Sequence, residues 1–442
     1  MIDGSKIEKG AQEIVKTLKN SGYQCFLVGG CVRDLLLGEL PHEWDLTTDA
    51  EPKVVSSLFH KVIPTGIKYG TVTVLLDEKT YEVTTFRKDE KYVDGRHPSN
   101  VKFTKKLDED LLRRDFTINA MAFDPIDLKF VDLFSGQKDL QNKIIRAVGD
   151  PKARFLEDGL RPVRACRFAA QLEFSIEHST FDAIGQVLQV VKKVAIERVH
   201  DELVKILKTN KPSTGIEYLR KAKILELFIP ELVGLVGVSQ PEEYHKHDVY
   251  WHSLFACDAA PKSNLAVRLA ALLHDIAKPS CKEGDTFYNH DKVGEDLSID
   301  ILKRLKFSNE IIGSVSNLVS NHMFNYDNSW SDSAVRRFIR RVGLENIGNL
   351  FELRKSDVAA MEHEIGSKYL QELQSRIDKI IAEENALHVT DLAIDGKDVM
   401  VHLNIQPGPK VGQILEELLE KALDNPSINT REQLLEILRA YK

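Results

Sequence analysis

The sequence of 442 residues is too long for one ordinary hydrophobic core, so we expect roughly two to four domains. Hydrophobic residues make up 43% of it and charged residues 29%, which favours a globular protein and excludes a disordered one. The formal net charge of −7 argues against a surface that is basic throughout, but it leaves room for a local basic patch.

Three features indicate the compartment. No apolar run approaches the roughly 18 residues that a membrane span requires. The start, MIDGSKIEKG, lacks the apolar core of a signal peptide. The five cysteines are scattered and contain no CxxC pair, which fits a reducing compartment. We therefore predict a cytoplasmic protein with no membrane span; the oligomeric state is left open.

Strand signals occupy the first 135 residues. The short β-branched stretches are 23–30, 70–76, 81–87 and 101–104, with a helical pattern at 51–60. From about residue 136 the apolar period changes to 3.6. The clearest helical stretches are 158–172, 196–209, 264–278, 296–307 and 413–423. We predict an α+β fold, with a mixed-sheet head followed by an almost all-helical remainder, and joints near 136–140, 208–212 and 386–390.

The stretch 29–49 combines glycines and carboxylates. Gly29 and Gly30 follow an apolar strand and precede a helical pattern, where a backbone can approach an anion closely. If Glu43 and Asp45 lie on a strand, their side chains point to one face and can share a cation. Carboxylates together with substrate phosphates suit Mg²⁺. The alternative is a solvated acidic strand end.

Six motifs in order resemble a known family. They are GG-x-VRD (29–34), acid-x-D-x-x-T (43–48), YEVTTFR (81–87), RRDFTINA (113–120), and the stretches 132–151 and 157–170. Together they resemble the head of the class II tRNA nucleotidyltransferases. This group comprises the CCA-adding enzymes and bacterial poly(A) polymerases, within the DNA polymerase β-like superfamily. The resemblance covers roughly residues 20–210.

The resemblance implies a role for each matching residue. Gly29, Gly30 and Arg33 would cradle a triphosphate, and Glu43 and Asp45 would hold catalytic Mg²⁺, with Glu82 in support. The motif that contacts the sugar and phosphates of the nucleotide is matched by Arg113, Arg114, Asp115 and Asn119. Without the resemblance, that motif would indicate a basic helix start capped by Asp115.

The stretch 157–164 is expected to read the base. On one helix Glu157, Arg161 and Arg164 would share a stripe. The resemblance implies that Asp158 and Arg161 act as a protein template for the Watson–Crick edge of CTP or ATP. The alternative is an ordinary salt-bridged surface. Pro162 would lie inside this helix and is expected to kink it.

Glu43 departs from the family, which has Asp at this position. The extra methylene moves the carboxylate by roughly one bond length, whereas Mg²⁺ requires near-octahedral distances. This difference has three alternative consequences. The strand shifts to absorb the extra length, the activity is reduced, or the head has been disabled by a substitution.

The polar stretch 87–103 resembles the loop that switches such enzymes from C to A addition, with its motif at Asp94 to Pro98. Its presence speaks against an enzyme that adds only CC. The stretch 64–74 resembles the CCA-adding version rather than the basic signature of poly(A) polymerases.

A second motif set lies in the helical remainder. His252, His274, Asp275 and Asp357 follow the H…HD…D order of HD-type phosphohydrolases. His290 and His322 match additional histidines that some members have. Imidazoles with carboxylates suit a divalent transition metal. The alternative for each histidine is a satisfied core residue, and hydrolysis is a separate question from metal binding.

We therefore predict a head at 1–138, a base-recognition neck at 139–210, a body with an HD-type domain at 211–385, and a tRNA-binding tail at 386–442. The predicted activity adds C, C and A from CTP and ATP to the 3′ end of tRNA, by two-metal phosphoryl transfer. The alternatives are an A-adding enzyme, a poly(A) polymerase, and a phosphohydrolase with an inactive head.

Overall fold

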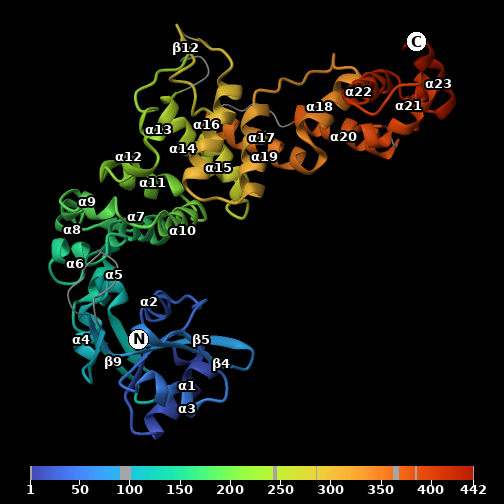
Figure 1. Cartoon of the computed structure of the whole chain (residues 1–442). Helices are drawn as coiled ribbons and strands as arrows, with labels where there is room; N and C mark the ends of the chain where they lie inside the picture. Colours follow the sequence, from blue (N-terminus) through green and yellow to red (C-terminus); the bar gives the residue numbers. More distant parts are fainter. Residues whose placement is uncertain are drawn as a thin grey trace. The chain divides into compact units, whose positions relative to one another are not determined.

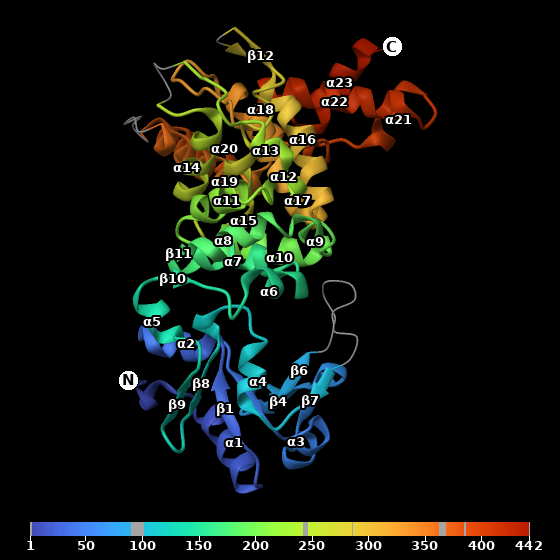
Figure 2. The same cartoon turned by 90° about the vertical axis from the view of Figure 1, so that its left-hand side faces the viewer.

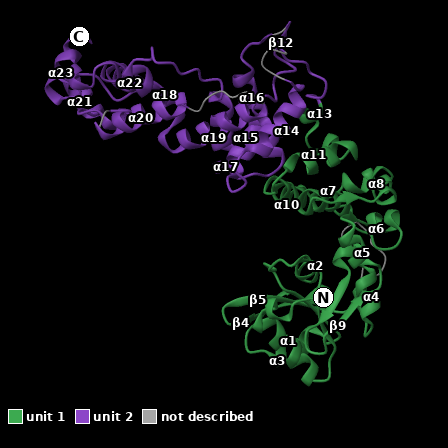
Figure 3. Ribbon diagram, turned by 180° about the vertical axis from the view of Figure 1, so that it is seen from behind, with its two compact units in different colours: residues 1–233 green, residues 234–442 purple. Residues whose placement is uncertain are grey.

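The structure is a computed structural model that describes residues 2–89, 101–241, 246–284, 286–361, 368–383 and 386–441. It divides into two compact units, 1–233 and 234–442 (Figure 3). The division falls inside the predicted body, and the finer four-part division stays a prediction. The motif Asp94 to Pro98 lies outside the described residues.

Unit 1 contains a seven-stranded mixed sheet in the order β3-β4-β5-β2-β1-β8-β9, whose last three strands can be followed in Figure 2. The strands are β1 (Cys25–Val28), β2 (Asp45–Thr48), β3 (Val62–Gly66), β4 (Thr71–Leu76), β5 (Lys79–Thr85), β8 (Met121–Asp124) and β9 (Lys129–Asp132). A separate pair, β6 (Arg87–Asp89) and β7 (Val101–Phe103), is antiparallel. The predicted strands at 23–30, 70–76, 81–87 and 101–104 are confirmed.

Helices α1 (Lys9–Asn20) and α3 (Pro52–Leu58) lie on the same side of this sheet (Figure 1). The fully buried Ile14, Val15 and Leu18 of α1 form a core with Leu27, Leu46 and other sheet residues. Because β2 pairs in parallel with β5, Asp45 stands directly opposite Glu82. The core therefore fixes the position of two acidic side chains.

The rest of unit 1 is mainly helical. Its helices are α2 (Gly30–Leu37), α4 (Leu107–Leu112), α5 (Gly136–Gln141), α6 (Pro151–Glu157), α7 (Arg161–Leu172), α8 (His178–Gly185), α9 (Leu188–Val191), α10 (Ile196–Leu207), α11 (Pro212–Lys221), α12 (Leu225–Phe228) and α13 (Pro230–Val233). A short parallel pair joins β10 (Ile144–Ile145) and β11 (Ser175–Ile176).

Three local predictions are wrong. Glu43 lies in a bend, because β2 begins only at Asp45. The stretch 157–164 is not one helix, since Asp158 is extended (φ −141°) and separates α6 from α7. Pro162 therefore lies in the first turn of α7, where the missing N–H has no helical partner to lose, and no kink at Pro162 is needed.

Unit 2 is helical apart from the hairpin β12 (Lys282–Glu283) and β13 (Thr286–Phe287). Its helices are α14 (Val249–Ala259), α15 (Leu265–Leu273), α16 (His290–Arg304), α17 (Asn309–Asn321), α18 (Asp332–Val342), α19 (Leu344–Ala360), α20 (Lys368–Ala382), α21 (Gly396–Leu403), α22 (Pro409–Asp424) and α23 (Arg431–Leu438). The α+β head and helical remainder are thus confirmed. Across the described ranges, none of the helices is long and apolar enough to cross a membrane.

Candidate functional sites

Three carboxylates, those of Glu43, Asp45 and Glu82, lie near enough to one another at the start of β2 to affect each other's ionisation. Burial raises the pKa of Asp45; the nearby Arg114 lowers it, and Glu43 raises it further. Burial also raises the pKa of Glu82, helped by Asp45 and Glu43. Carboxylates that resist ionisation in each other's presence fit a bound divalent cation, which would neutralise them. The predicted Mg²⁺ ligands therefore have a suitable electrostatic setting, with Glu43 contributed from the bend.

Gly29 brings the backbone close to this acidic group. Its φ of +75° is in the region that favours glycine. A Cβ at this position would lie 3.2 Å from Nη1 of Arg114 and 3.3 Å from Oδ2 of Asp45. Gly30 then begins α2. The two predicted glycines therefore stand where a phosphate could meet both the guanidinium and the helix start.

Arg33 is held by two side chains. It is 5% exposed, and its Nε donates to Oδ1 of Asp34 at 2.9 Å. Its Nη1 donates to Oδ1 of Asn119 at 2.8 Å. Asn119 in turn donates to Oδ1 of Asp115 at 3.3 Å. The structure thus joins the GG-x-VRD motif to the RRDFTINA motif.

Asp110 is a buried residue that the sequence analysis missed. Its carboxylate accepts from Arg113 at 2.8 and 3.0 Å and from Arg114 at 3.4 Å. Burial opposes ionisation, but the two guanidinium groups lower the pKa of Asp110. Its position three and four residues before the two arginines, on α4, was the available signal. The arginines follow the end of this helix, so they are not at a helix start.

Asp115 and Arg164 form an ion pair between the end of the RRD motif and α7. The Nε and Nη2 atoms of Arg164 lie 2.8 and 2.6 Å from Oδ2 of Asp115. Burial opposes ionisation of Asp115, but Arg164 overcomes it and lowers the pKa to about 2. Asp115 is therefore a charged connector rather than a helix cap.

The two predicted base-reading side chains both have protein partners. Asp158 accepts from both terminal nitrogens of Arg198, at 3.0 and 2.8 Å. Arg161 donates to Glu157 at 2.5 Å and to the carbonyl oxygens of Arg154 and Arg113 at 2.8 Å each. Arg198 was not predicted, because it lies 40 residues from Asp158 in the sequence. The Glu157–Arg161 contact is present although the two residues are on different helices.

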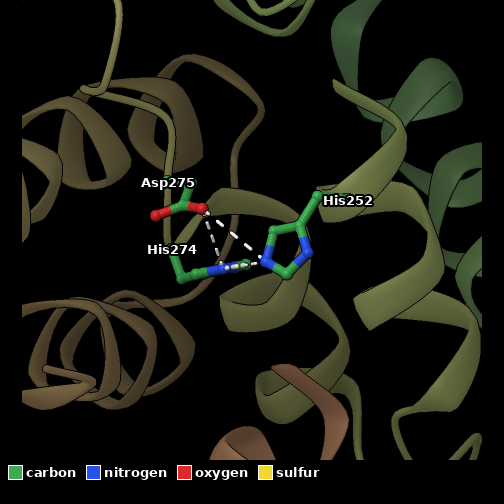
Figure 4. A group of neighbouring side chains, drawn as sticks. All are labelled: His252, His274 and Asp275. Atoms are coloured by element: carbon green, nitrogen blue, oxygen red, sulfur yellow. Dashed lines mark hydrogen bonds and ion pairs between the residues drawn. The ribbon is translucent and has the colours of Figure 1, made fainter. Parts of the chain in front are cut away.

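Six predicted metal ligands come together in unit 2, from helices α14, α16 and α19 and from the turns after α15 and α17. Figure 4 shows three of them, His252, His274 and Asp275, which converge on one point. His252 Nε2 lies 3.2 Å from His274 Nε2 and 2.9 Å from Oδ1 of Asp357. Asp275, His290 and His322 form a second close group, with 3.2 Å between the two Nε2 atoms. Among the described residues, the close groups of three metal-ligating side chains are these two.

Asp275 belongs to both groups. Its Oδ2 lies 3.2 Å from His274 Nε2 and 3.7 Å from His252 Nε2. Its Oδ1 lies 3.4 Å from His290 Nε2 and 3.8 Å from His322 Nε2. One carboxylate therefore presents a different oxygen to each pair of imidazoles, which is the arrangement of a bridging ligand.

The backbone fixes the proton on three of the imidazoles. Nδ1 of His274, His290 and His322 lies 2.8, 2.7 and 2.6 Å from the carbonyl oxygen three residues earlier. A carbonyl can only accept, so each Nδ1 donates and each neutral ring turns an Nε2 lone pair inward. Two lone pairs that face each other at 3.2 Å repel unless positive charge lies between them, so the donor set fits a metal.

The electrostatics of this group of histidines and carboxylates also fit a bound cation. Burial disfavours a charged His274, but Asp275 and Asp357 outweigh it and raise its pKa to about 10. Burial and the neighbouring His274 lower the pKa of His322 to about 3. Burial also opposes the ionisation of Asp275 and Asp357, yet the imidazoles hold their pKa values well below the ordinary range. Two buried carboxylates thus demand positive charge at this point.

Three family models match the chain. The poly(A) polymerase head domain matches residues 25–146, and the probable RNA- and SrmB-binding site of polymerase A matches 173–235. The tRNA nucleotidyltransferase domain 2 matches 290–438. None of these three descriptions is of an HD-type domain, which stays a prediction.

Curated relatives align over nearly the whole chain. The CCA-adding enzyme of Enterococcus faecalis is 32% identical over 438 residues, which cover 98% of this chain and 96% of that enzyme. That of Ligilactobacillus salivarius is 33% identical over 97% of this chain and 95% of its own. The chain belongs to the CCA-adding enzymes, the class II tRNA nucleotidyltransferases that the sequence predicted.

The fold is also similar to those of solved CCA-adding enzymes. The CCA-adding enzyme of Bacillus stearothermophilus in complex with CTP has a TM-score of 0.75 at 27% identity, covering 98% of this chain and 96% of that one. The Thermotoga maritima CCA-adding enzyme in complex with tRNA has a TM-score of 0.55 at 19% identity, which shows likeness of fold alone.

Proposed function

We propose that the head site of this CCA-adding enzyme transfers CMP, CMP and AMP from CTP and ATP to the 3′-hydroxyl of tRNA and releases pyrophosphate. The observation that supports this assignment is the approach of Gly29, Arg114 and Asp45 to one point, at the start of β2 where Asp45 pairs with Glu82 on β5. Because tRNA maturation serves translation, we place the protein in the cytoplasm.

Glu43 and Asp45 would hold Mg²⁺, with Glu82 in support. The ion, when bound, polarises phosphoryl oxygens and favours ionisation of the attacking hydroxyl. The chain itself orients the nucleotide: the backbone at Gly29 and Gly30 and the side chains of Arg33, Arg113 and Arg114 face the phosphates. Stabilising charge at fixed positions is what phosphoryl transfer chiefly requires.

Base selection would use the hydrogen-bonding capacity that remains on Asp158 and Arg161. A carboxylate has about four lone-pair sites. The contacts of the described residues use three on Asp158, from Arg198 twice and from the N–H of Leu160. Of the five N–H groups of Arg161, three are used. What remains can meet the amino group and ring acceptor that cytosine and adenine share.

Three tRNA transcripts, ending before CCA, after C and after CC, test this function with Mg²⁺, CTP and ATP. We expect all three to reach CCA, and Asp45→Ala to abolish every step while the far-UV circular dichroism is unchanged. Growth of only the CC-ended transcript would define an A-adding enzyme, and long adenylate tails a poly(A) polymerase. If none of the transcripts grows, Glu43→Asp should restore transfer. If that variant is also inactive, the assignment of the transfer site to the head is contradicted.

We also propose that the unit 2 group holds divalent transition metal and hydrolyses phosphate esters. The supporting observation is the shared carboxylate: Asp275 faces His252 and His274 with one oxygen, and His290 and His322 with the other. Two ions on such a carboxylate would clamp the attacking water and the leaving oxygen. Lys278, 2.7 Å from Oδ2 of Asp275, adds a cation near the phosphate.

Metal content and hydrolysis test this second function separately. With Asp45→Ala as background, we expect about two equivalents of Mn²⁺ per chain and cleavage of bis-p-nitrophenyl phosphate by water, which yields p-nitrophenol and the monoester. Asp275→Ala should lose both and keep CCA addition in the otherwise native protein. Bound metal without hydrolysis would limit the site to a structural role. The absence of bound metal would contradict the proposed metal site.

A further inference from the structure

Three guanidinium groups surround one buried ring in unit 1. Phe168, on α7, is 4% exposed. The guanidinium carbon of Arg167 lies 3.6 Å from the ring centroid, and those of Arg164 and Arg33 lie 5.3 and 5.4 Å from it. All three distances are within the roughly 6 Å over which a cation is attracted to an aromatic face. Two of the three arginines belong to the predicted nucleotide site.

Each guanidinium also has a carboxylate on another side. The pairs are Arg33–Asp34 at 2.7 Å, Arg164–Asp115 at 2.6 Å and Arg167–Glu202 at 2.7 Å. The carboxylates offset the repulsion among the three guanidinium groups, so all three can contact the same ring. An arginine held by both a carboxylate and a ring has little freedom to rotate.

The contacts close into a cycle. Arg33 donates to Asn119, Asn119 donates to Asp115, and Arg164 donates to Asp115. Phe168 completes the cycle, because it contacts both Arg33 and Arg164. It is the one member without a hydrogen-bonding side chain. Replacing it leaves every hydrogen bond of the cycle possible and removes only the support that both arginines share.

We propose that Phe168 is a positioning residue that pre-organises Arg33 and Arg164 for the triphosphate of the incoming nucleotide. This inference rests on the proposed function, in which Arg33 faces the phosphates, and it adds Arg164, which pairs with Asp115 of the RRD motif, to the same group. A long side chain that is ordered before the ligand arrives loses less rotamer freedom on binding, and the affinity rises accordingly.

Phe168→Leu tests the proposal by steady-state kinetics on a CC-ended tRNA with ATP and a C-ended tRNA with CTP. Losing two cation–ring contacts should raise the KM of both nucleotides about five- to tenfold. The two increases should match, because CTP and ATP carry the same triphosphate. The kcat and the KM of tRNA should stay within twofold, and Phe168→Tyr, which keeps the ring, should restore the nucleotide KM.

Phe155→Leu is the matched control. Phe155 is a fully buried phenylalanine on the adjacent helix α6, and no cation contacts its ring in the described part of the chain. This variant should lose comparable stability and keep the native KM. If Phe168→Leu does not fold, Phe168→Met, which fills a similar volume without a ring, takes its place.

Arg33→Ala separates the positioning role of Phe168 from the assignment of Arg33 to the triphosphate. If it raises the nucleotide KM while the Phe168 variants do not, the role of Phe168 is overturned and the nucleotide site stands. If neither changes the KM, the assignment of Arg33 to the triphosphate is overturned as well. A fall in kcat at unchanged KM for Phe168→Leu would also contradict the proposal.

Discussion

Gly29 lies where the backbone comes closest to the proposed catalytic carboxylate. For Gly29→Ala we expect loss of transfer by at least about a hundredfold, because the new methyl group would stand 3.2–3.3 Å from Arg114 and Asp45 at a strained φ. The measurement is single-turnover incorporation of AMP into CC-ended tRNA.

Gly22→Ala controls for the backbone strain alone. Gly22 has a similar φ of +86°, but no atom lies within 4 Å of its added Cβ. It should cost about 1–2 kcal/mol of stability and leave transfer intact. Equal activity losses in the two variants would show that strain, not crowding of the site, is responsible.

At this scale the sequence predicted the residues that belong to motifs and missed those that support them. Gly29, Arg33 and Asp45 have recognisable spacing. Arg198 does not, because its importance comes from the partner that it meets after folding, 40 residues away in the sequence. The spacing of Asp110 from Arg113 and Arg114 was a signal, but the burial of its carboxylate beneath them is visible only in the folded protein.

Among the elements, the start of α7 differs from the prediction, which placed Pro162 inside the helix. The effect of replacing Pro162 on the free energy of unfolding can test the observed position. Pro162 stands in that turn, so Pro162→Ala should lower the free energy of unfolding of unit 1 by about 0.4–1 kcal/mol, through a more flexible unfolded chain. A proline inside the helix would give the opposite sign, a gain of about 3 kcal/mol. Urea unfolding followed by circular dichroism measures the sign.

Ala165→Pro provides the contrasting variant, since it places a proline beyond the first turn of the same helix. It should destabilise unit 1 by about 3 kcal/mol or more. A gain of stability in Pro162→Ala would contradict the position of the helix start.

The link between the RRD motif and α7 should depend on pH. The pKa of Asp115 falls from 3.8 to about 2, so its pairing with Arg164 stabilises the folded protein by about 2 kcal/mol above pH 4. This contribution is lost as the pH falls from about 4 towards 2, because the unfolded carboxyl, with the higher pKa, takes up a proton before the folded one does. The difference in unfolding free energy between native protein and Asp115→Asn should therefore shrink between pH 7 and pH 3.

Elements were predicted where one periodicity was clear. The strands β4 and β5 and the long helices α10 and α22 carry such patterns, and β1 was found from its apolar run ending at two glycines. Strand β8 (Met121–Asp124) was missed because it is buried throughout and has no β-branched residue, so neither alternation nor composition marks it. The chain break at Asp158 was missed because the i, i+4 spacing continues across it.

For the whole molecule, the two units should respond differently to metal. With Asp45→Ala as background, Mn²⁺ at a hundred times its dissociation constant should stabilise unit 2 by about 2.7 kcal/mol for each bound ion, because the ligands are assembled only in the folded state. Differential scanning calorimetry with Mn²⁺ and with EDTA should show this as a shift of one unfolding transition. His274→Ala should remove the shift, and an equal shift in that variant would contradict the site.

The sequence supplied the order of these ligands from the resemblance, over the 105 residues between His252 and Asp357. It could not show that Asp275 divides its two oxygens between two pairs of imidazoles. That feature arises from the packing of α14, α15, α16 and α17, and no spacing along the chain encodes it.

The carbonyls behind His274, His290 and His322 have a further consequence for how such a centre changes over time. Each orienting partner belongs to the peptide backbone three residues before its histidine. A main-chain oxygen is present whatever side chain that position carries. Neighbouring positions can therefore accumulate substitutions while the rings keep their orientation, provided that the local turn survives. The layer that orients these rings is inherited with the local backbone turns, so its loss would have to begin at the histidines themselves.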